Sequence, residues 1–291
     1  QDFEALKKKA QQRDFTPVPL TGASLDAKYA VKTEVITSHN VAARLEGSTH
    51  PDETVIYSAH WDHIGVGEPD ARGDRIFNGA LDNASGTASL IELARGFAKA
   101  PRPQRSVVFL AVTAEEKGLL GSEYYATHPL YPLEKTVAMI NMDGMAPFGP
   151  SRDFGIYGAA RFELLDQLKD VAKGWDIRYT PDPKPEAGLF FRSDHFPFAK
   201  RGVPALSWSA GQDWVDGGVA AGKKASEDYT AKRYHQQGDE WQPDWVFAGA
   251  ARDLEVLYTL GNQLANSRSW PNWSKDEAFR AVRDASADQR K

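Results

Sequence analysis

The chain has 291 residues, of which 41% are hydrophobic and 26% charged, with a net charge of −5. These values are typical of a globular protein with a full core, and an acidic chain without a basic stripe argues against nucleic acid as a partner. No apolar run approaches the roughly 20 residues of a membrane helix, so we expect no membrane insertion, and the absence of cysteine excludes disulfides and thiolate metal ligands.

Strand and helix patterns alternate along most of the chain. Alternating or continuous apolar runs predict strands over 25–47, 54–63, 105–114, 136–145, 176–182 and 203–211. Helical spacing of apolar residues predicts helices over 1–12, 85–99, 118–129, 161–174 and 244–266, with a short one within 193–202. The Gly- and Ala-rich segment 214–233 is predicted to be a loop.

Strands alternating with helices predict an α/β fold, namely a three-layer α/β/α sandwich with a central mixed, mostly parallel sheet. We expect residues 1–22 to be an N-terminal helix and linker left from a longer precursor, because the chain begins without methionine. Residues 23–267 are expected to form the catalytic domain. Residues 268–291 are expected to be a tail packed on that domain.

Polar side chains follow the predicted strands, where α/β sheets bind their ligands. His60 and Asp62 follow the run "TVIYSA", the pair Glu115 and Glu116 follows "VVFLAVTA", and Asp143 follows "TVAMINM". Two further candidates precede helices, Asp82 in "GALDNASG" and His235 in "KRYHQQGDE". Each of these residues alone would more often be a helix cap or a solvated loop residue, but their joint occurrence after three strands is harder to explain in that way.

Histidines and carboxylates without cysteine suit zinc, and also manganese or cobalt. The set is larger than one catalytic zinc uses and fits two metals that share a bridging carboxylate. Two cations would also keep the clustered carboxylates ionised. His60 and Asp62 are two residues apart in a strand and therefore point to one face, so we expect Asp62 to fix the tautomer of His60 through its second ring nitrogen.

At these residues the sequence resembles the co-catalytic zinc aminopeptidases of metallopeptidase family twenty-eight, which also holds glutamate carboxypeptidases and glutaminyl cyclases. The matching pieces are "AHWDHIG", "NGALDNASGTASLIELAR", "TAEEKGLLGSEYY", "INMDGM", "SDHFPFAKRGVPAL" and "YHQQGDEW", in the family's order. The resemblance implies two zinc ions per chain, with Asp82 bridging them. It implies that His60 and Asp143 complete one site, and that Glu116 and His235 complete the other.

The resemblance further implies that Glu115 is the general base rather than a ligand, and that the Asp82–Asn83 peptide is often cis. Some relatives place an oxyanion tyrosine near the "SDH" motif, where this chain has "GLFFRSDH". Tyr234 directly precedes His235, as in the carboxypeptidase branch, and we predict that it stabilises the oxyanion. Ser193 to His195 cannot form a serine triad as consecutive residues and are expected to shape the site.

The resemblance favours an aminopeptidase that acts on peptides, and it implies an exported, periplasmic or secreted protein with a protease-associated domain upstream. A carboxypeptidase stays open because Arg192 and Arg233 lie near the motifs. A glutaminyl cyclase with one zinc and a non-catalytic binding module also stay open. Candidates for an apolar substrate pocket are Phe190, Phe191, Trp208, Trp214 and Trp241, and the remaining histidines (His39, His50, His63 and His128) are expected to be structural or on the surface.

Overall fold

The structure of the protein is a computed structural model, and it describes residues 2–290. Its main sheet has seven strands in the order β1-β5-β2-β6-β9-β7-β8. They are β1 (Val41–Leu45), β2 (His50–His60), β5 (Arg105–Val112), β6 (Thr136–Met142), β7 (Asp153–Ile156), β8 (Arg178–Tyr179) and β9 (Ala205–Ala210). A separate two-stranded ribbon pairs β3 (Gly65–Val66) with β4 (Ile76–Phe77).

The centre of the sheet is parallel and its flanks are mixed, as the sequence predicts. Strands β5, β2, β6 and β9 run parallel, whereas β1 is antiparallel to β5 and β7 is antiparallel to β9. In the register, His60 at the end of β2 lies opposite Val112 at the end of β5. The carboxyl ends of the parallel strands therefore meet at one edge.

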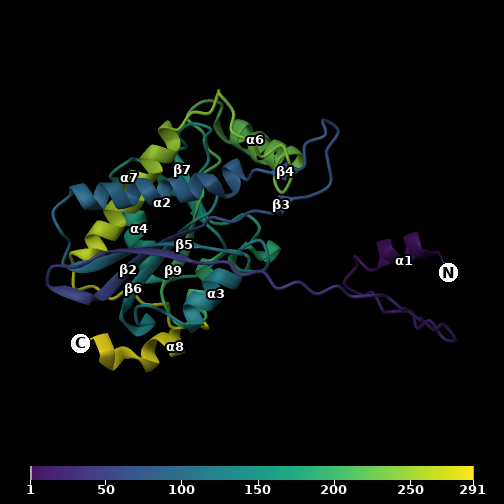
Figure 1. The fold of residues 1–291 in the computed structure, drawn as a ribbon, viewed down its shortest axis with the longest axis horizontal. Coiled ribbons are helices and arrows are strands. Elements are labelled where there is room, and N and C mark those ends of the chain that lie inside the picture. The colour runs from purple at the N-terminus through teal and green to yellow at the C-terminus, as the bar shows by residue number, and fades with distance from the viewer. Residues whose placement is uncertain (1, 291) are drawn as a thin grey trace. The chain divides into compact units, whose positions relative to one another are not determined.

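Helices cover both faces of the sheet, which confirms the α/β/α sandwich. They are α2 (Ser85–Lys99), α3 (Leu120–Thr127), α4 (Glu163–Lys173), α5 (His195–Ala199), α6 (Gly218–Lys232), α7 (Ala248–Ala265) and α8 (Arg280–Ala285). In Figure 1, α2 and α7 lie on one face and α3 lies on the other, where α5 packs beside it. Because both faces are covered, β6 is buried along its whole length.

A close contact fixes α7 on the sheet. The Tyr57 hydroxyl on β2 donates a 2.7 Å hydrogen bond to the carbonyl oxygen of Leu257 on α7. Gly261, one turn further along, makes room for this ring, since a Cβ there would lie 1.8 Å from the Tyr57 hydroxyl oxygen. Because Gly261 has no side chain, α7 lies close enough to β2 for the Tyr57 hydroxyl to reach the helix backbone.

The contacts within the chain separate Gln1–Thr37 from Ser38–Lys291, whereas we expected the catalytic domain to begin at residue 23. The domain boundaries themselves stay predictions. The first unit contains α1 (Phe3–Lys9), which Asp2 caps by accepting hydrogen bonds from the backbone N–H groups of Glu4 and Ala5. Acceptor side chains at this position satisfy the free N–H groups of a first helical turn.

Two predictions of secondary structure were wrong. The alternating segment 25–47 forms a strand only over Val41–Leu45, because alternation gives a strand only where a neighbouring strand offers hydrogen bonds. The expected loop 214–233 contains α6. Alanines and ion pairs four residues apart, among them Lys224–Asp228 and Asp228–Lys232, stabilise this helix, although its only buried residue is Gly222.

The C-terminal tail packs against the sheet within the second unit through buried side chains. Trp273 is fully buried, and its indole N–H donates to the carbonyl oxygen of Gly202 at 3.0 Å. Arg283 on α8 donates to the carbonyl oxygen of Thr136 at 2.9 Å, at the start of β6. These bonds hold the tail against the end of the sheet opposite to the carboxyl edge of β6.

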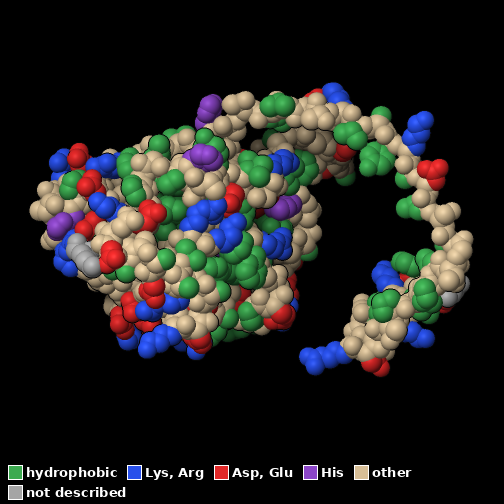
Figure 2. Space-filling model, turned by 90° about the horizontal axis from the view of Figure 1, so that it is seen from below, with side chains coloured by type: hydrophobic (Ala, Val, Ile, Leu, Met, Phe, Trp, Pro, Cys, Tyr) green, Lys and Arg blue, Asp and Glu red, His purple; other side chains and the backbone are tan. Residues whose placement is uncertain are grey.

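On the face shown in Figure 2, lysines and arginines are intermingled with acidic side chains. Within residues 2–290, none of the helices combines the length and the apolar character that crossing a bilayer requires.

Candidate metal centre

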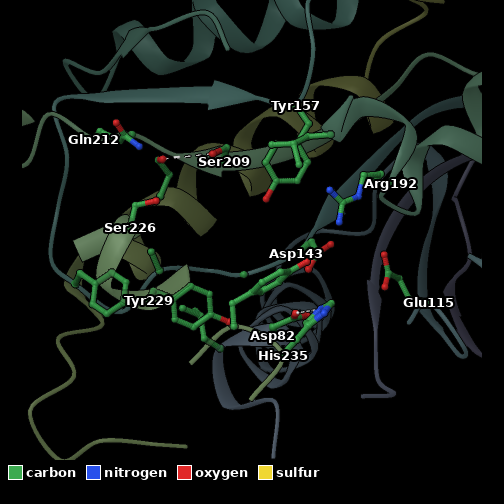
Figure 3. Close-up of a pocket in the computed structure, with 18 of the residues that line it drawn as sticks. Asp82, Glu115, Asp143, Tyr157, Arg192, Ser209, Gln212, Ser226, Tyr229 and His235 are labelled. Atoms are coloured by element: carbon green, nitrogen blue, oxygen red, sulfur yellow. Dashed lines mark hydrogen bonds and ion pairs between the residues drawn. The ribbon is translucent and has the colours of Figure 1, made fainter. Parts of the chain in front are cut away.

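The predicted site residues gather at the carboxyl edge of the sheet. His60 ends β2, Glu115 and Glu116 follow β5, and Asp143 follows β6. The short distorted helical turn η1 (Ala80–Ala84) before α2 adds a fifth side chain, Asp82, and the loop after α6 adds His235. Figure 3 shows Asp82 and His235 close together at one side of a cavity, with Tyr157 reaching in from the other side.

Asp82 stands between two histidines. Its Oδ1 lies 3.2 Å from Nε2 of His60, and its Oδ2 lies 3.3 Å from Nε2 of His235. A carboxylate whose two oxygens face two separate nitrogen donors has the arrangement of a bridge between two cations. It divides the centre into half-site one (His60, Asp82 and Asp143) and half-site two (Asp82, Glu116 and His235).

Half-site one is deeply buried. The Nε2 atom of His60 lies 3.3 Å from Oδ1 of Asp143, and the His60 side chain is 1% exposed. Burial lowers the pKa of His60, but the carboxylates of Asp143 and Asp82 outweigh it and raise that pKa well above its usual range. The Ser193 hydroxyl donates to Oδ2 of Asp143 at 3.2 Å, which orients this carboxylate toward His60.

Half-site two is more open. The Nε2 atom of His235 lies 3.1 Å from Oε2 of Glu116, and the His235 side chain is 36% exposed. His235 has a positive φ of 57°, so a left-handed loop position presents its ring. Burial raises the pKa of Glu116, but the contact with His63 and the charges of both histidines lower it below its usual value.

The residues fit a pair of divalent cations. Both half-sites combine one imidazole nitrogen with carboxylate oxygens, the donor types that zinc binds in catalytic sites. Four carboxylates (Asp82, Glu115, Glu116 and Asp143) line the cavity, and bound cations would offset their mutual repulsion.

Asp62 does not act on His60 as expected. The Nδ1 atom of His60 bonds to the main-chain carbonyl oxygen of Asp62 at 3.1 Å, whereas the nearer carboxylate oxygen of Asp62 is 3.8 Å away. That carboxylate instead accepts hydrogen bonds from the backbone N–H groups of Glu115 and Glu116, at 3.0 and 3.3 Å. The backbone carbonyl of Asp62 therefore fixes the tautomer of His60. Its carboxylate holds the backbone of Glu115 and Glu116 in place.

Glu115 lines the cavity without joining either half-site. Burial is the main reason why the pKa of its carboxyl is raised to about 9; the charge of His60 opposes this shift and the charge of Asp143 adds to it. Cations in the half-sites would oppose this shift, since they favour the ionised carboxylate. A carboxyl with a strongly shifted pKa, beside ligands but not among them, has the properties of a proton-transfer group.

Three tyrosines line the cavity, which has a volume of about 550 Å³. Tyr234 stacks on His235 with the ring centroids 3.9 Å apart, and it is 36% exposed. Tyr229 donates its hydroxyl hydrogen to Oδ2 of Asp239 at 3.2 Å, so this hydrogen is already used in a bond within the protein. Tyr157 follows β7 and points its hydroxyl into the cavity (Figure 3), and the sequence analysis missed it.

Asp239 is a further residue that the sequence analysis missed. It is fully buried, and its carboxylate accepts hydrogen bonds from the backbone N–H groups of Leu81 and Asp82 at 3.1 and 3.0 Å. It lies four residues after His235, so it ties the two ligand loops together. Its place in the motif "YHQQGDE", close to the ligand His235, was the feature of the sequence that could have identified it. Beside these bonds, the Asp82–Asn83 peptide is cis, as the resemblance implies.

The consecutive residues Ser193, Asp194 and His195 form no triad. Ser193 donates to Asp143, while Asp194 accepts from the Ser122 hydroxyl at 2.6 Å. The ring of His195 is buried and packs edge-on against Phe190. Among the predicted pocket aromatics, Phe191 and Trp214 line the cavity with Arg192, whereas Phe190 and Trp208 are buried in the core and Trp241 is exposed.

An α/β/α sandwich with histidine–carboxylate groups at its strand ends has the architecture of a metallopeptidase. The chain belongs to Peptidase family M28, whose family model matches residues 40–258. Aminopeptidase NAALADL1 of Mus musculus is 31% identical over 200 residues, which cover 60% of this chain and 24% of the relative. A probable zinc metalloprotease of Pyrenophora teres f. teres is 40% identical over 103 residues, or 35% of this chain and 22% of the relative.

Solved structures share the fold. The aminopeptidase from Aneurinibacillus sp. strain AM-1 has a TM-score of 0.57 at 22% identity and covers 79% of this chain and 48% of its own. A glutaminyl cyclase from an Acidobacteriales bacterium has a TM-score of 0.52 at 22% identity and covers 79% of this chain and 74% of its own. This chain spans about a quarter of the length of the curated relatives named above.

Proposed function

We propose that this chain is the catalytic part of a two-metal zinc aminopeptidase that removes N-terminal residues from peptides. The observation that carries the proposal is the position of Asp82, whose two carboxylate oxygens face the Nε2 atoms of His60 and His235. The names of the relatives support zinc and N-terminal cleavage for those proteins.

The proposed roles follow from the geometry. Two divalent cations bound in the half-sites would lower the pKa of a water molecule and polarise the scissile carbonyl group. Glu115 accepts the proton of the attacking water and later passes it to the leaving amine. Tyr234 donates its hydroxyl hydrogen to the carbonyl oxygen as negative charge develops there. The raised pKa of Tyr234, about 12 and caused mainly by burial, keeps this hydrogen in place near neutral pH.

The charge of the cavity supports an amine-bearing substrate. Its lining includes Glu115 and Asp143, which would attract the ammonium group of a peptide N-terminus. Arg192 is the one Lys or Arg among the described lining residues. Acidic side chains therefore dominate the electrostatic field that an incoming peptide meets.

The test combines metal content with hydrolysis. Zinc would be counted by mass spectrometry on chelator-free protein for the wild type, Glu115→Gln and the control Glu123→Gln, whose glutamate pairs with Lys200 and Arg201 outside the cavity. Hydrolysis of leucine p-nitroanilide would be measured beside its N-acetylated form.

We expect about two zinc ions in all three proteins and no cleavage of the blocked substrate. Hydrolysis should fall by about 10²–10⁴-fold in Glu115→Gln alone, because only that change removes the proton-transfer group. One zinc or none, with no hydrolysis after metal is added, would overturn the two-metal proposal. Equal cleavage of the blocked substrate would overturn N-terminal specificity.

A further inference from the structure

His63 lies inside the metal centre, although it was expected to be structural or on the surface. Its side chain is 7% exposed, and its Nδ1 atom lies 2.7 Å from Oε1 of Glu116. Ligand-type atoms of His63, Asp82 and Glu116 all lie within 4.8 Å of one another. Half-site two thus contains a second imidazole besides that of His235.

The His63 ring is held in place by its neighbours. Gly79 leaves space for it, since a Cβ on that glycine would come within 2.7 Å of Cγ of His63. The ring of His235 meets it edge-on, with the centroids 5.9 Å apart. An imidazole packed between a backbone and another ring has few alternative rotamers, so its contact with Glu116 is built into the fold.

The contact lacks the angle of a hydrogen bond, although the distance suits one. Both ring nitrogens of His63 and Oε1 of Glu116 are buried without a hydrogen-bond partner among residues 2–290. Buried polar atoms normally find a partner, and at 2.7 Å a small rotation of the ring directs an N–H on Nδ1 toward Oε1. These atoms therefore satisfy each other at little structural cost.

Glu116 consequently faces a different histidine with each oxygen. Oε1 faces Nδ1 of His63, while Oε2 lies 3.1 Å from Nε2 of His235. The oxygen beside His235 is also on the side of the shared Asp82, whose Oδ2 faces the same nitrogen. An N–H bond to Oε1 would leave Oε2 as the oxygen available to a cation.

We propose that His63 is a positioning residue of half-site two, which donates its Nδ1–H to Oε1 of Glu116 and thereby makes Oε2 the single ligand oxygen. This inference rests on the proposed function, because it concerns the cation of that half-site. A glutamate that binds through one oxygen occupies one coordination position of the metal instead of two. His63 thus keeps a position free for the substrate carbonyl group.

The test measures metal binding directly. Purified chain freed of metal would be titrated with Co²⁺ by calorimetry and visible absorption, for the wild type, His63→Leu, His63→Asn and the control His128→Leu. The asparagine side chain of His63→Asn would place an amide N–H near the position of Nδ1, whereas a leucine side chain offers no donor. His128 is exposed directly after α3 and belongs to neither half-site.

We expect the second Co²⁺ to bind about 10–100-fold more weakly in His63→Leu, the usual effect of losing a partner of a metal ligand, while the first is unaffected. His63→Asn should recover much of this affinity with the Co²⁺ spectrum of the wild type. Unchanged second-site affinity in His63→Leu would overturn the inference. So would an altered spectrum in His63→Asn, because it would make His63 itself a ligand.

The two proposals fail in different ways. A wild type that binds two Co²⁺ ions and hydrolyses peptides, with an unaffected His63→Leu variant, would contradict only the role of His63. A wild type that binds fewer than two ions would overturn the proposed function and this inference with it. Circular dichroism of each variant would establish that the compared proteins are folded.

Discussion

The two half-sites hold the same types of ligand in different ways. In half-site one, His60 and Asp143 stand at the ends of strands whose register the sheet fixes. In half-site two, His235 lies on an irregular loop and is far more exposed than His60. Sheet pairing therefore orders the histidine and Asp143 of half-site one, whereas half-site two depends on individual side-chain contacts such as that of His63 with Glu116.

The largest difference should appear when each histidine is removed. We expect both His60→Ala and His235→Ala to lower kcat/KM more than 100-fold, since losing a ligand exceeds the 10–100-fold loss typical of an outer partner. Only His60→Ala should also lower the Tm of the metal-free protein, because it leaves Asp82 and Asp143 buried without a cation. Calorimetry and steady-state kinetics measure both effects. A larger Tm loss in His235→Ala would contradict the comparison.

Tyr234→Phe tests the loop of half-site two for a catalytic group. Removing one hydrogen-bond donor to an oxyanion costs about 10²–10³-fold in kcat, and KM should change little because the bond forms in the transition state. Steady-state kinetics beside Tyr124→Phe, an exposed tyrosine on α3, supplies the control. A raised KM with unchanged kcat would assign Tyr234 to substrate binding instead.

Asp239→Asn should affect both half-sites, because Asp239 holds the backbone of the shared Asp82. Weaker acceptance of the N–H groups of Leu81 and Asp82 is expected to cost about 1–3 kcal/mol in the free energy of unfolding. Both cations should bind about 10-fold more weakly, whereas the His63 variants affect only the second. Urea unfolding and Co²⁺ titration measure this, with the exposed Asp170→Asn as the control. Weaker binding of only one of the two cations would contradict a role of Asp239 in both half-sites.

The smallest effect on the centre is expected from Gly261→Ala, because Gly261 contributes no ligand to either half-site. The added Cβ would press on the Tyr57 hydroxyl and lower the free energy of unfolding by about 1–3 kcal/mol, as overpacking usually does. The ratio of the two Co²⁺ affinities should stay that of the wild type. Urea unfolding measures the loss of stability, and Co²⁺ titration measures the two affinities. A changed ratio would mean that a general loss of stability is enough to weaken one half-site more than the other.

The sequence predicted the strands that carry the centre better than the loops around it. Apolar runs before His60, Glu115 and Asp143 become β2, β5 and β6, because a strand covered on both faces must be apolar throughout. The pattern in 25–40 was misleading, since strand formation also needs a partner with free hydrogen-bonding groups. The glycines at the start of α6 led to the prediction of a loop over 214–233, because composition alone does not show that the alanines and charged residues after them form a helix.

Residue types and their spacing thus determined the α/β/α fold and placed histidines and carboxylates at one edge of the sheet. Only the tertiary structure decided which oxygen of Asp82 faces which histidine, and that His63 and Asp239 belong to the centre. The physical reason is that periodicity encodes local geometry. The bond between Asp239 and Leu81, by contrast, joins residues 158 positions apart, and the packing of whole elements brings them together.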